Sequence, residues 1–190
     1  MSQLIAITGP SLAGKTTLTD SLKKQDNIIV PRHITTREQR VDDEPGFYRY
    51  VSVDDFQWLR EQDAMLFSSG AGNRLYGVLI EDLEESFLKA DNAIVNISYK
   101  DIYQYILLEY RKMLITLTFH DIKEGMKKRN TIMSRTMTPE ELMMRINAAL
   151  SDQEAYFELI KKYSDCLLYT EELNKEEVFT KAMQKIKSLK

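Results

Sequence analysis

The sequence predicts an α/β fold in which a parallel sheet is flanked by helices. Short apolar runs of strand length alternate along the chain with helical patterns. The first run leads directly into a glycine-containing turn, from Gly9 to Gly14, that opens a helix. Strand, helix and strand in this order require a parallel sheet, because each helix carries the chain back to the edge where the next strand starts. The 190 residues are enough for one such domain with a sizeable core.

The strands of this sheet are expected at five apolar runs, and the helices at four stretches with helical spacing. In the first of these helices, for example, Leu18 and Leu22 lie four residues apart on one face. The strands are expected at residues 3–8, 27–30, 91–98, 112–119 and 165–169, and the helices at 14–24, 99–111, 121–130 and 173–189.

Two segments interrupt this alternation. Residues 32–83 are β-rich and aromatic, which predicts a small inserted subdomain. Its strand-like stretches are "GFYRYVSV", "AMLFSS" and "RLYGVL", and it has one helical stretch in "DDFQWLREQ". Residues 124–150 are rich in Arg, Lys and Met, and we expect them to form a helical lid. Thr138 as N-cap, Pro139 in the first turn and Glu141 three residues after the cap predict the start of a helix. The core then comprises about residues 1–31, 84–123 and 151–190.

Composition argues against several classes of protein. The formal net charge of −3 disfavours a nucleic-acid-binding surface, which needs a basic face. Cys166 is the one cysteine, so an intrachain disulfide is excluded and a reducing compartment fits. The start of the chain lacks the pattern of a signal peptide, and no apolar run approaches the roughly 20 residues that span a bilayer. We expect a cytoplasmic protein without membrane or nucleic-acid partners; its oligomeric state is left open.

The stretch "ITGPSLAGKTT" has the spacing G-x-x-x-x-G-K-[ST] of a phosphate-binding loop. A strand precedes it and a helix opens at Gly14, so backbone N–H groups and the helix N-terminus would face phosphates. Lys15 would reach the terminal phosphates of ATP, and the Thr16 hydroxyl would ligate Mg²⁺. The alternative, an ordinary glycine turn, is disfavoured by this context. The expected ATP-binding residues of this P-loop NTPase core are Gly9, Pro10, Ser11, Leu12, Ala13, Gly14, Lys15, Thr16 and Thr17.

Further motifs resemble those of the guanylate kinase family over nearly the full length. They are "GPSLAGKT", "TTREQR", "FYRYVSVDDF" and "LYGV". The resemblance implies transfer of the γ-phosphoryl group of ATP to the phosphate of GMP, with Mg²⁺. It also implies that Arg37, Arg40, Tyr48 and Tyr76 bind the acceptor's phosphate. Arginine forks and tyrosine hydroxyls suit that dianion on chemical grounds as well. Lys15 and the lid arginines Arg135 and Arg145 are the catalytic residues that the resemblance implies.

The departures from the family pattern concentrate where guanine is bound. Phe67 stands in place of a glutamate, and Val78 in place of a hydroxyl residue. Asn96 and Ser98 replace two aspartates at a strand end, which leaves the metal mainly to Thr16 and the phosphates. The acidic groups that match the donors of guanine are therefore missing together, and we expect poor guanine selectivity.

Two other functions stay open. The segments "HITTR", "LYGV" and "IVNIS" are similar to segments of the ribose 1,5-bisphosphate kinases, which implies a sugar phosphate as the acceptor. A non-catalytic guanylate kinase-like binding module is the other alternative, although such a module has no need of Gly14, Lys15 and Thr16. The two histidines, His33 and His120, are interpreted as ordinary polar residues near strand ends.

Overall fold

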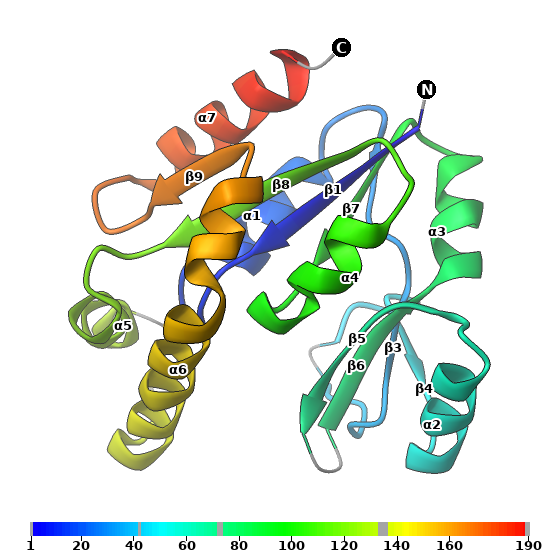
Figure 1. Cartoon of the computed structure of the whole chain (residues 1–190), viewed down its shortest axis with the longest axis horizontal. Helices are drawn as coiled ribbons and strands as arrows, with labels where there is room; N and C mark the ends of the chain where they lie inside the picture. The colour runs from blue at the N-terminus through cyan, green and yellow to red at the C-terminus, as the bar shows by residue number, and fades with distance from the viewer. Residues whose placement is uncertain (1, 42, 72–73, 133–136, 189–190) are drawn as a thin grey trace.

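The computed structural model describes residues 2–41, 43–71, 74–132 and 137–188. Its core is a parallel sheet in the order β2-β7-β1-β8-β9 (Figure 1). The strands are β1 (Gln3–Thr8), β2 (Ile28–Ile29), β7 (Asn92–Asn96), β8 (Lys112–Thr118) and β9 (Cys166–Tyr169). Because all five run in the same direction, their carboxyl ends meet at one edge, where parallel α/β sheets bind ligands.

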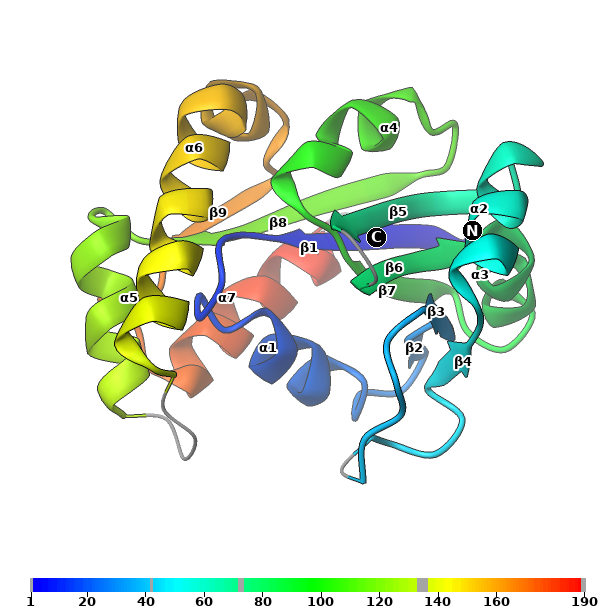
Figure 2. The same cartoon turned by 90° about the horizontal axis from the view of Figure 1, so that it is seen from below.

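Helices cover both faces of this sheet, as Figure 2 shows. Side chains alternate along β1: Ile5 and Ile7 contribute to the core on the α1 and α7 side, while Leu4 and Ala6 contribute to the core on the opposite side. Burial on both faces explains why β1 and β8 are continuous apolar runs. The helices of the core are α1 (Lys15–Leu22), η1 (Tyr99–Asp101), α4 (Ile102–Leu107), α5 (Ile122–Thr131), α6 (Pro139–Tyr163) and α7 (Lys175–Ser188).

A second sheet of four strands, in the order β4-β3-β6-β5, lies beside the core and shares no strand with it. It packs on α2, where Phe56 is buried while Trp58 is exposed. The strands and helices of this part are β3 (His33–Thr35), β4 (Tyr48–Tyr50), α2 (Val53–Glu61), β5 (Met65–Ala71), β6 (Arg74–Leu79) and α3 (Ile80–Phe87).

The predicted α/β class with its parallel sheet is confirmed. Helix α6 begins as predicted, because the Thr138 hydroxyl accepts a hydrogen bond from the Glu141 amide at 3.2 Å and Pro139 is the first helical residue. Strand β3 and helix α3 are additions to the prediction. Within the described residues, none of the helices combines the length and apolarity that a membrane span requires.

Candidate functional site

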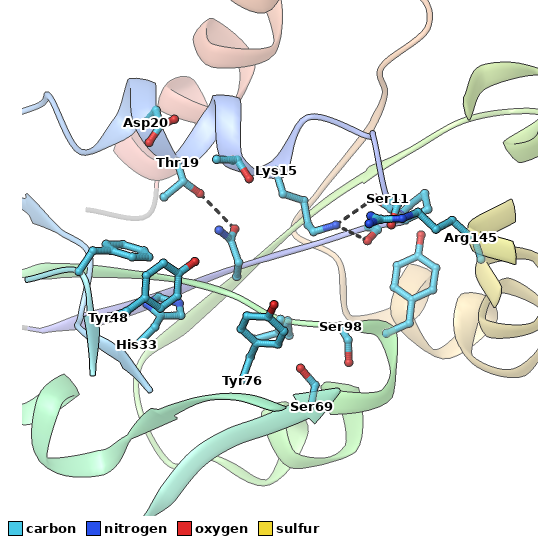
Figure 3. A pocket seen from close by; sticks show the side chains of 18 of the residues that line it. Ser11, Lys15, Thr19, Asp20, His33, Tyr48, Ser69, Tyr76, Ser98 and Arg145 are labelled. Atoms are coloured by element: carbon cyan, nitrogen blue, oxygen red, sulfur yellow. Dashed lines mark hydrogen bonds between the residues drawn. The ribbon is translucent and has the colours of Figure 1, made fainter. Parts of the chain in front are cut away.

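A cleft of about 650 Å³ separates the carboxyl edge of the core sheet from the second sheet (Figure 3). The loop after β1 and helix α1 form one wall, and β3, β4, β5 and β6 supply the opposite wall. The end of β7 and helix α6 close the remaining side. The cleft therefore brings together segments that are far apart in the sequence, which is the arrangement expected of a binding site in this class of sheet.

The loop between β1 and α1 has an unusual backbone. Gly9, Leu12 and Gly14 have φ angles of +147°, +66° and +96°. Gly14 is also the N-cap of α1 and offers no side chain to the first-turn N–H groups. These amides have no partners within the helix, so the loop presents donors and the positive end of the helix dipole to an anion.

Lys15 folds back over this loop. Its Nζ donates hydrogen bonds to the carbonyl oxygens of Gly9 at 2.7 Å and Pro10 at 2.9 Å. Desolvation by burial lowers the pKa of Lys15 to about 8. In the part of the chain that the structure describes, Lys15 has no carboxylate within ion-pair distance. Its ammonium group is therefore held in place and is not neutralised.

Except for Leu12, the predicted ATP-binding residues divide between two hollows. Gly9, Pro10, Ser11, Lys15 and Thr16 line the cleft. Leu12 is partly buried and packs against the core below the loop. A second hollow, of about 40 Å³, lies on the other side of the loop and is lined by Ala13, Gly14, Thr17, Leu18, Arg129, Thr170, Leu173, Asn174, Lys175 and Val178.

The predicted magnesium ligand, Thr16, is exposed in the cleft. At the end of β7, the Asn96 Oδ1 accepts a hydrogen bond from Thr19 at 3.1 Å, and the Ser98 hydroxyl donates to Asp101 at 2.8 Å. Among the described residues, no three His, Cys, Asp or Glu side chains lie together as a metal site. Mg²⁺ takes oxygen ligands and keeps several waters. The Thr16 hydroxyl therefore fits an ion whose other ligands would be phosphate oxygens and water.

The opposite wall of the cleft is one face of the second sheet. Strand register places its side chains in two rows, because every second residue of a strand points to the same face. The His33 row consists of Tyr48, His33, Val78 and Phe67, and the Thr35 row consists of Tyr50, Thr35, Tyr76 and Ser69.

Of the predicted acceptor-binding residues, Tyr48, Tyr76, Asn96 and Ser98 line the cleft. Figure 3 shows that Tyr48 and Tyr76 lie across from Lys15. Phe67 and Val78 are 3% and 2% exposed and belong to the core that also contains Ile97 and Tyr99. These two side chains therefore pack behind the surface of the cleft and do not line it.

Arg37 and Arg40 are also absent from the lining of the cleft. Both guanidinium NH groups of Arg37 donate to the Asp43 carboxylate, and this pair is almost fully buried. The carboxylate also accepts from the Tyr50 hydroxyl at 2.6 Å and from the Arg40 amide at 2.7 Å. These bonds, led by that of Arg37, hold the pKa of Asp43 well below its usual range. Arg40 itself is exposed.

Arg37 still touches the cleft wall, because its guanidinium carbon lies 4.7 Å from the ring centroid of Tyr48. The structure thus brings Tyr48 and Tyr76 to the cleft, puts Arg37 directly behind Tyr48, and leaves Arg40 outside. Their joint binding of one phosphate stays a prediction. Arg145 lines the cleft from α6 and lies beside Ser11 and the end of Lys15 in Figure 3, whereas Arg135 lies outside the described residues.

Several cleft residues were not predicted. At the mouth, Lys23 of α1 pairs with Glu44 at 2.6 Å and with Asp20 at 3.3 Å. Asp152 of α6 lies 3.6 Å from Lys100. The carboxylates of the cleft therefore have basic partners. Arg145 is itself paired with Glu141 at 2.9 Å, so among the described residues that line the cleft Lys15 is the cation without a carboxylate partner. The same side of the cleft also contains His33 and Phe47. No signal in the sequence placed them there, because His33 belongs to the short strand β3, which was not predicted.

Comparison with known proteins identifies the family. The family model described as guanylate kinase matches residues 1–184. The chain belongs to the guanylate kinase family. Among curated relatives of this family, guanylate kinase from Mycoplasma genitalium is 26% identical over 136 residues, which are 67% of this chain and 56% of that protein. Guanylate kinase from Pasteurella multocida is 33% identical over 106 residues, 53% of this chain and 51% of the relative.

The chain thus spans about half the length of these two guanylate kinases. The crystal structure of guanylate kinase from Anaplasma phagocytophilum has a TM-score of 0.69 to this chain at 16% identity, covering 98% of this chain and 85% of the other. At this identity the likeness concerns the fold alone. The predicted resemblance to the guanylate kinase family, with its P-loop core, is confirmed.

Proposed function

We propose that this guanylate kinase family member transfers the γ-phosphoryl group of ATP to a phosphate monoester, with GMP as the lead acceptor and with weak selectivity for guanine. The observation that carries the proposal is the placement of Lys15 and the phosphate-binding loop opposite Tyr48 and Tyr76 in one cleft. Phosphoryl transfer needs little covalent chemistry from the protein; it needs two substrates held in line and their charge neutralised.

On the donor side, the N–H groups of the loop and of the first turn of α1 would bind the β- and γ-phosphates. Lys15 would exchange its bonds to the Gly9 and Pro10 carbonyls for bonds to phosphate oxygens. Thr16 would hold Mg²⁺, which would supply further charge neutralisation at the phosphates. The hollow lined by Thr17 and Arg129 adjoins the loop; at about 40 Å³ it is smaller than an adenosine, which would lie across its mouth.

On the acceptor side, the hydroxyls of Tyr48 and Tyr76 would donate hydrogen bonds to the acceptor's phosphate. Arg37, whose guanidinium packs on the Tyr48 ring, acts as a positioning residue for Tyr48 in this arrangement. Arg145 enters from α6 and would contact the phosphoryl group in transfer. The helix covers one side of the cleft, and water excluded there cannot compete as the acceptor.

One observation supports the second candidate, a ribose bisphosphate. Phe67 and Val78 fill the positions where a guanine-binding site has polar side chains, and both are buried. A site without polar partners for the base loses little when the base is absent. The acceptor phosphate would still meet Tyr48 and Tyr76.

A coupled assay with ATP and Mg²⁺ tests the proposal, using GMP, AMP and ribose 1,5-bisphosphate at matched concentrations. We expect phosphorylation of at least one of them, and a ratio of kcat/KM for GMP over AMP below roughly 100, against the 10⁴ to 10⁵ that a hydrogen-bonding site can reach. Lys15→Ala is the matched negative control. Turnover of none of the three, or equal turnover by the Lys15→Ala variant, would contradict the proposal. A GMP preference of 10⁴ or more would contradict the weak selectivity alone.

A further inference from the structure

His33 occupies the polar position nearest to Phe67 and Val78 on the cleft-facing sheet. It is the direct neighbour of Val78 on β6 and of Tyr48 on β4, and Val78 in turn pairs with Phe67 on β5. In this row, Tyr48 is expected to meet the phosphate, and the two buried apolar residues offer no hydrogen bond. His33 is thus the remaining polar side chain of the row.

The tautomer of His33 follows from its surroundings. Its Nδ1 lies 2.9 Å from the carbonyl oxygen of Pro31, and a carbonyl oxygen can only accept a hydrogen bond. Nδ1 therefore carries the proton, and Nε2 of the neutral ring has a free lone pair. Within the described part of the chain, Nε2 makes no hydrogen bond.

The ring is also fixed in orientation. It is only 9% exposed, and it stacks on Phe47 with centroids 4.9 Å apart and planes 17° apart. The Tyr48 ring forms a T-shaped pair with it, with centroids 6.2 Å apart. Two aromatic neighbours and the bond to Pro31 leave the ring little freedom, so the Nε2 lone pair is presented from a rigid support. The ring lines the cleft on the acceptor side.

We infer that His33 is a specificity-determining residue, whose Nε2 accepts one hydrogen bond from a donor group of the phosphorylated acceptor. This inference rests on the proposed function and names the substrate class of the same site. The class is a phosphate monoester that presents a single N–H or O–H donor to His33.

The chemistry of one neutral acceptor differs from that of a carboxylate. Guanine offers donors at N1 and at its 2-amino group, and two carboxylate oxygens can accept both. One Nε2 lone pair can accept one hydrogen bond, and the amino groups of adenine, cytosine and guanine each supply one. His33 therefore favours an acceptor that carries the donor over an analogue without it, because the analogue would displace water from the Nε2 lone pair without replacing its hydrogen bond.

The test compares acceptors that differ in one donor. AMP and purine riboside 5′-monophosphate are matched except for the 6-amino group. We expect kcat/KM of the wild type to favour AMP by about 5- to 20-fold, the effect of one hydrogen bond to a buried partner. The His33→Leu variant should lower this ratio to about 1, and His33→Gln, whose amide oxygen reaches the position of Nε2, should restore part of it. His120→Leu is the control for loss of a histidine elsewhere, since His120 is exposed and stacks on Tyr169.

A second arm identifies the source of the donor. Ribose 1,5-bisphosphate and its 2-deoxy analogue differ in one hydroxyl, and a ratio that depends on His33 in this pair alone assigns the contact to a sugar hydroxyl. The inference would be overturned if wild type and His33→Leu gave the same selectivity ratios in both arms. The proposed function would still stand in that case, because turnover of the acceptors would have been measured. If the wild type phosphorylates none of the acceptors, isothermal titration of AMP and purine riboside monophosphate with both proteins gives the same ratios as binding constants. Equal binding ratios would then overturn the inference.

Discussion

Replacement of Gly9 by alanine should destabilise the fold through two separate effects. Gly9 has a φ of +147°, a region of backbone conformation that is essentially restricted to glycine and costs other residues on the order of 1–3 kcal/mol. An added Cβ would lie 2.0 Å from the carbonyl oxygen of Leu117. That oxygen belongs to the backbone of β8, a central strand, so relief requires a shift of the sheet, which costs roughly 1–3 kcal/mol more.

The matched control is Gly46→Ala. Gly46 also has a positive φ, +78°, but its Cβ would meet nothing within 4 Å, so only the backbone cost of about 1–2 kcal/mol applies. For a chain of this length, 1 kcal/mol corresponds to about 2–4 °C in Tm. Gly9→Ala should therefore lower Tm by about 8–16 °C, at a total of about 4 kcal/mol, and Gly46→Ala by about 2–8 °C.

Differential scanning calorimetry measures both, and circular dichroism before the scan checks that each variant is folded. Equal Tm values for Gly9→Ala and Gly46→Ala would show that β8 does not restrict the loop, and the steric part of the reasoning would be wrong. Since the unfolding free energy of a natural domain is about 5–15 kcal/mol, the Gly9→Ala variant should remain folded at 20 °C and be measurable.

Three further predictions follow from the charged groups. The Lys15 pKa of about 8 should rise when phosphates bind, so ATP binding at pH 8.5 should take up more than half a proton. Calorimetric titrations in buffers of different ionisation enthalpy measure this proton uptake. The same uptake by the Lys15→Ala variant would contradict the prediction. Burial lowers the pKa of His33 below its usual 6.5, so the unfolded chain binds more protons, and the fold should lose up to about 1.4 kcal/mol per pH unit below pH 6.5. His33→Gln should reduce this loss in urea titrations at pH 7 and pH 5.5, and an unchanged loss would contradict the prediction. Asp43→Asn should lower Tm at pH 7, because it breaks the buried pair with Arg37. Since the folded pKa of Asp43 is depressed, that difference should shrink as pH falls below 3.8; a constant difference would refute it.

The sequence predicts those parts of the fold that depend on neighbouring residues. The strands β1 and β8 are apolar runs because both of their faces are buried, and the Thr138 cap is a short-range pattern. Strand β3 was missed, because three residues with alternating polar side chains give too weak a pattern. Helix α3 was missed because Ile80 follows β6 with no residue between them, so no turn marks the boundary.

The candidate site divides in the same way. The loop from Gly9 to Thr16 is one continuous segment, and its strand and helix context is readable from the sequence. The partner of Arg37 cannot be read from the sequence. Which carboxylate of "EQRVDDE" pairs with Arg37 depends on how this segment turns back, and the structure selects Asp43. Likewise, the pairing of His33 with Val78 is a matter of strand register across residues far apart in the chain, which no local pattern specifies.

The separation of the two sheets has a practical consequence for spectroscopy. The chain has one tryptophan and one cysteine. Trp58 is exposed on α2, beside the second sheet, and Cys166 is on β9 of the core sheet. A dye attached to Cys166 would form a single energy-transfer pair with Trp58 and would report changes in the separation of the two sheets without any engineered residue. Burial raises the pKa of the Cys166 thiol, so the labelling should be carried out under alkaline conditions.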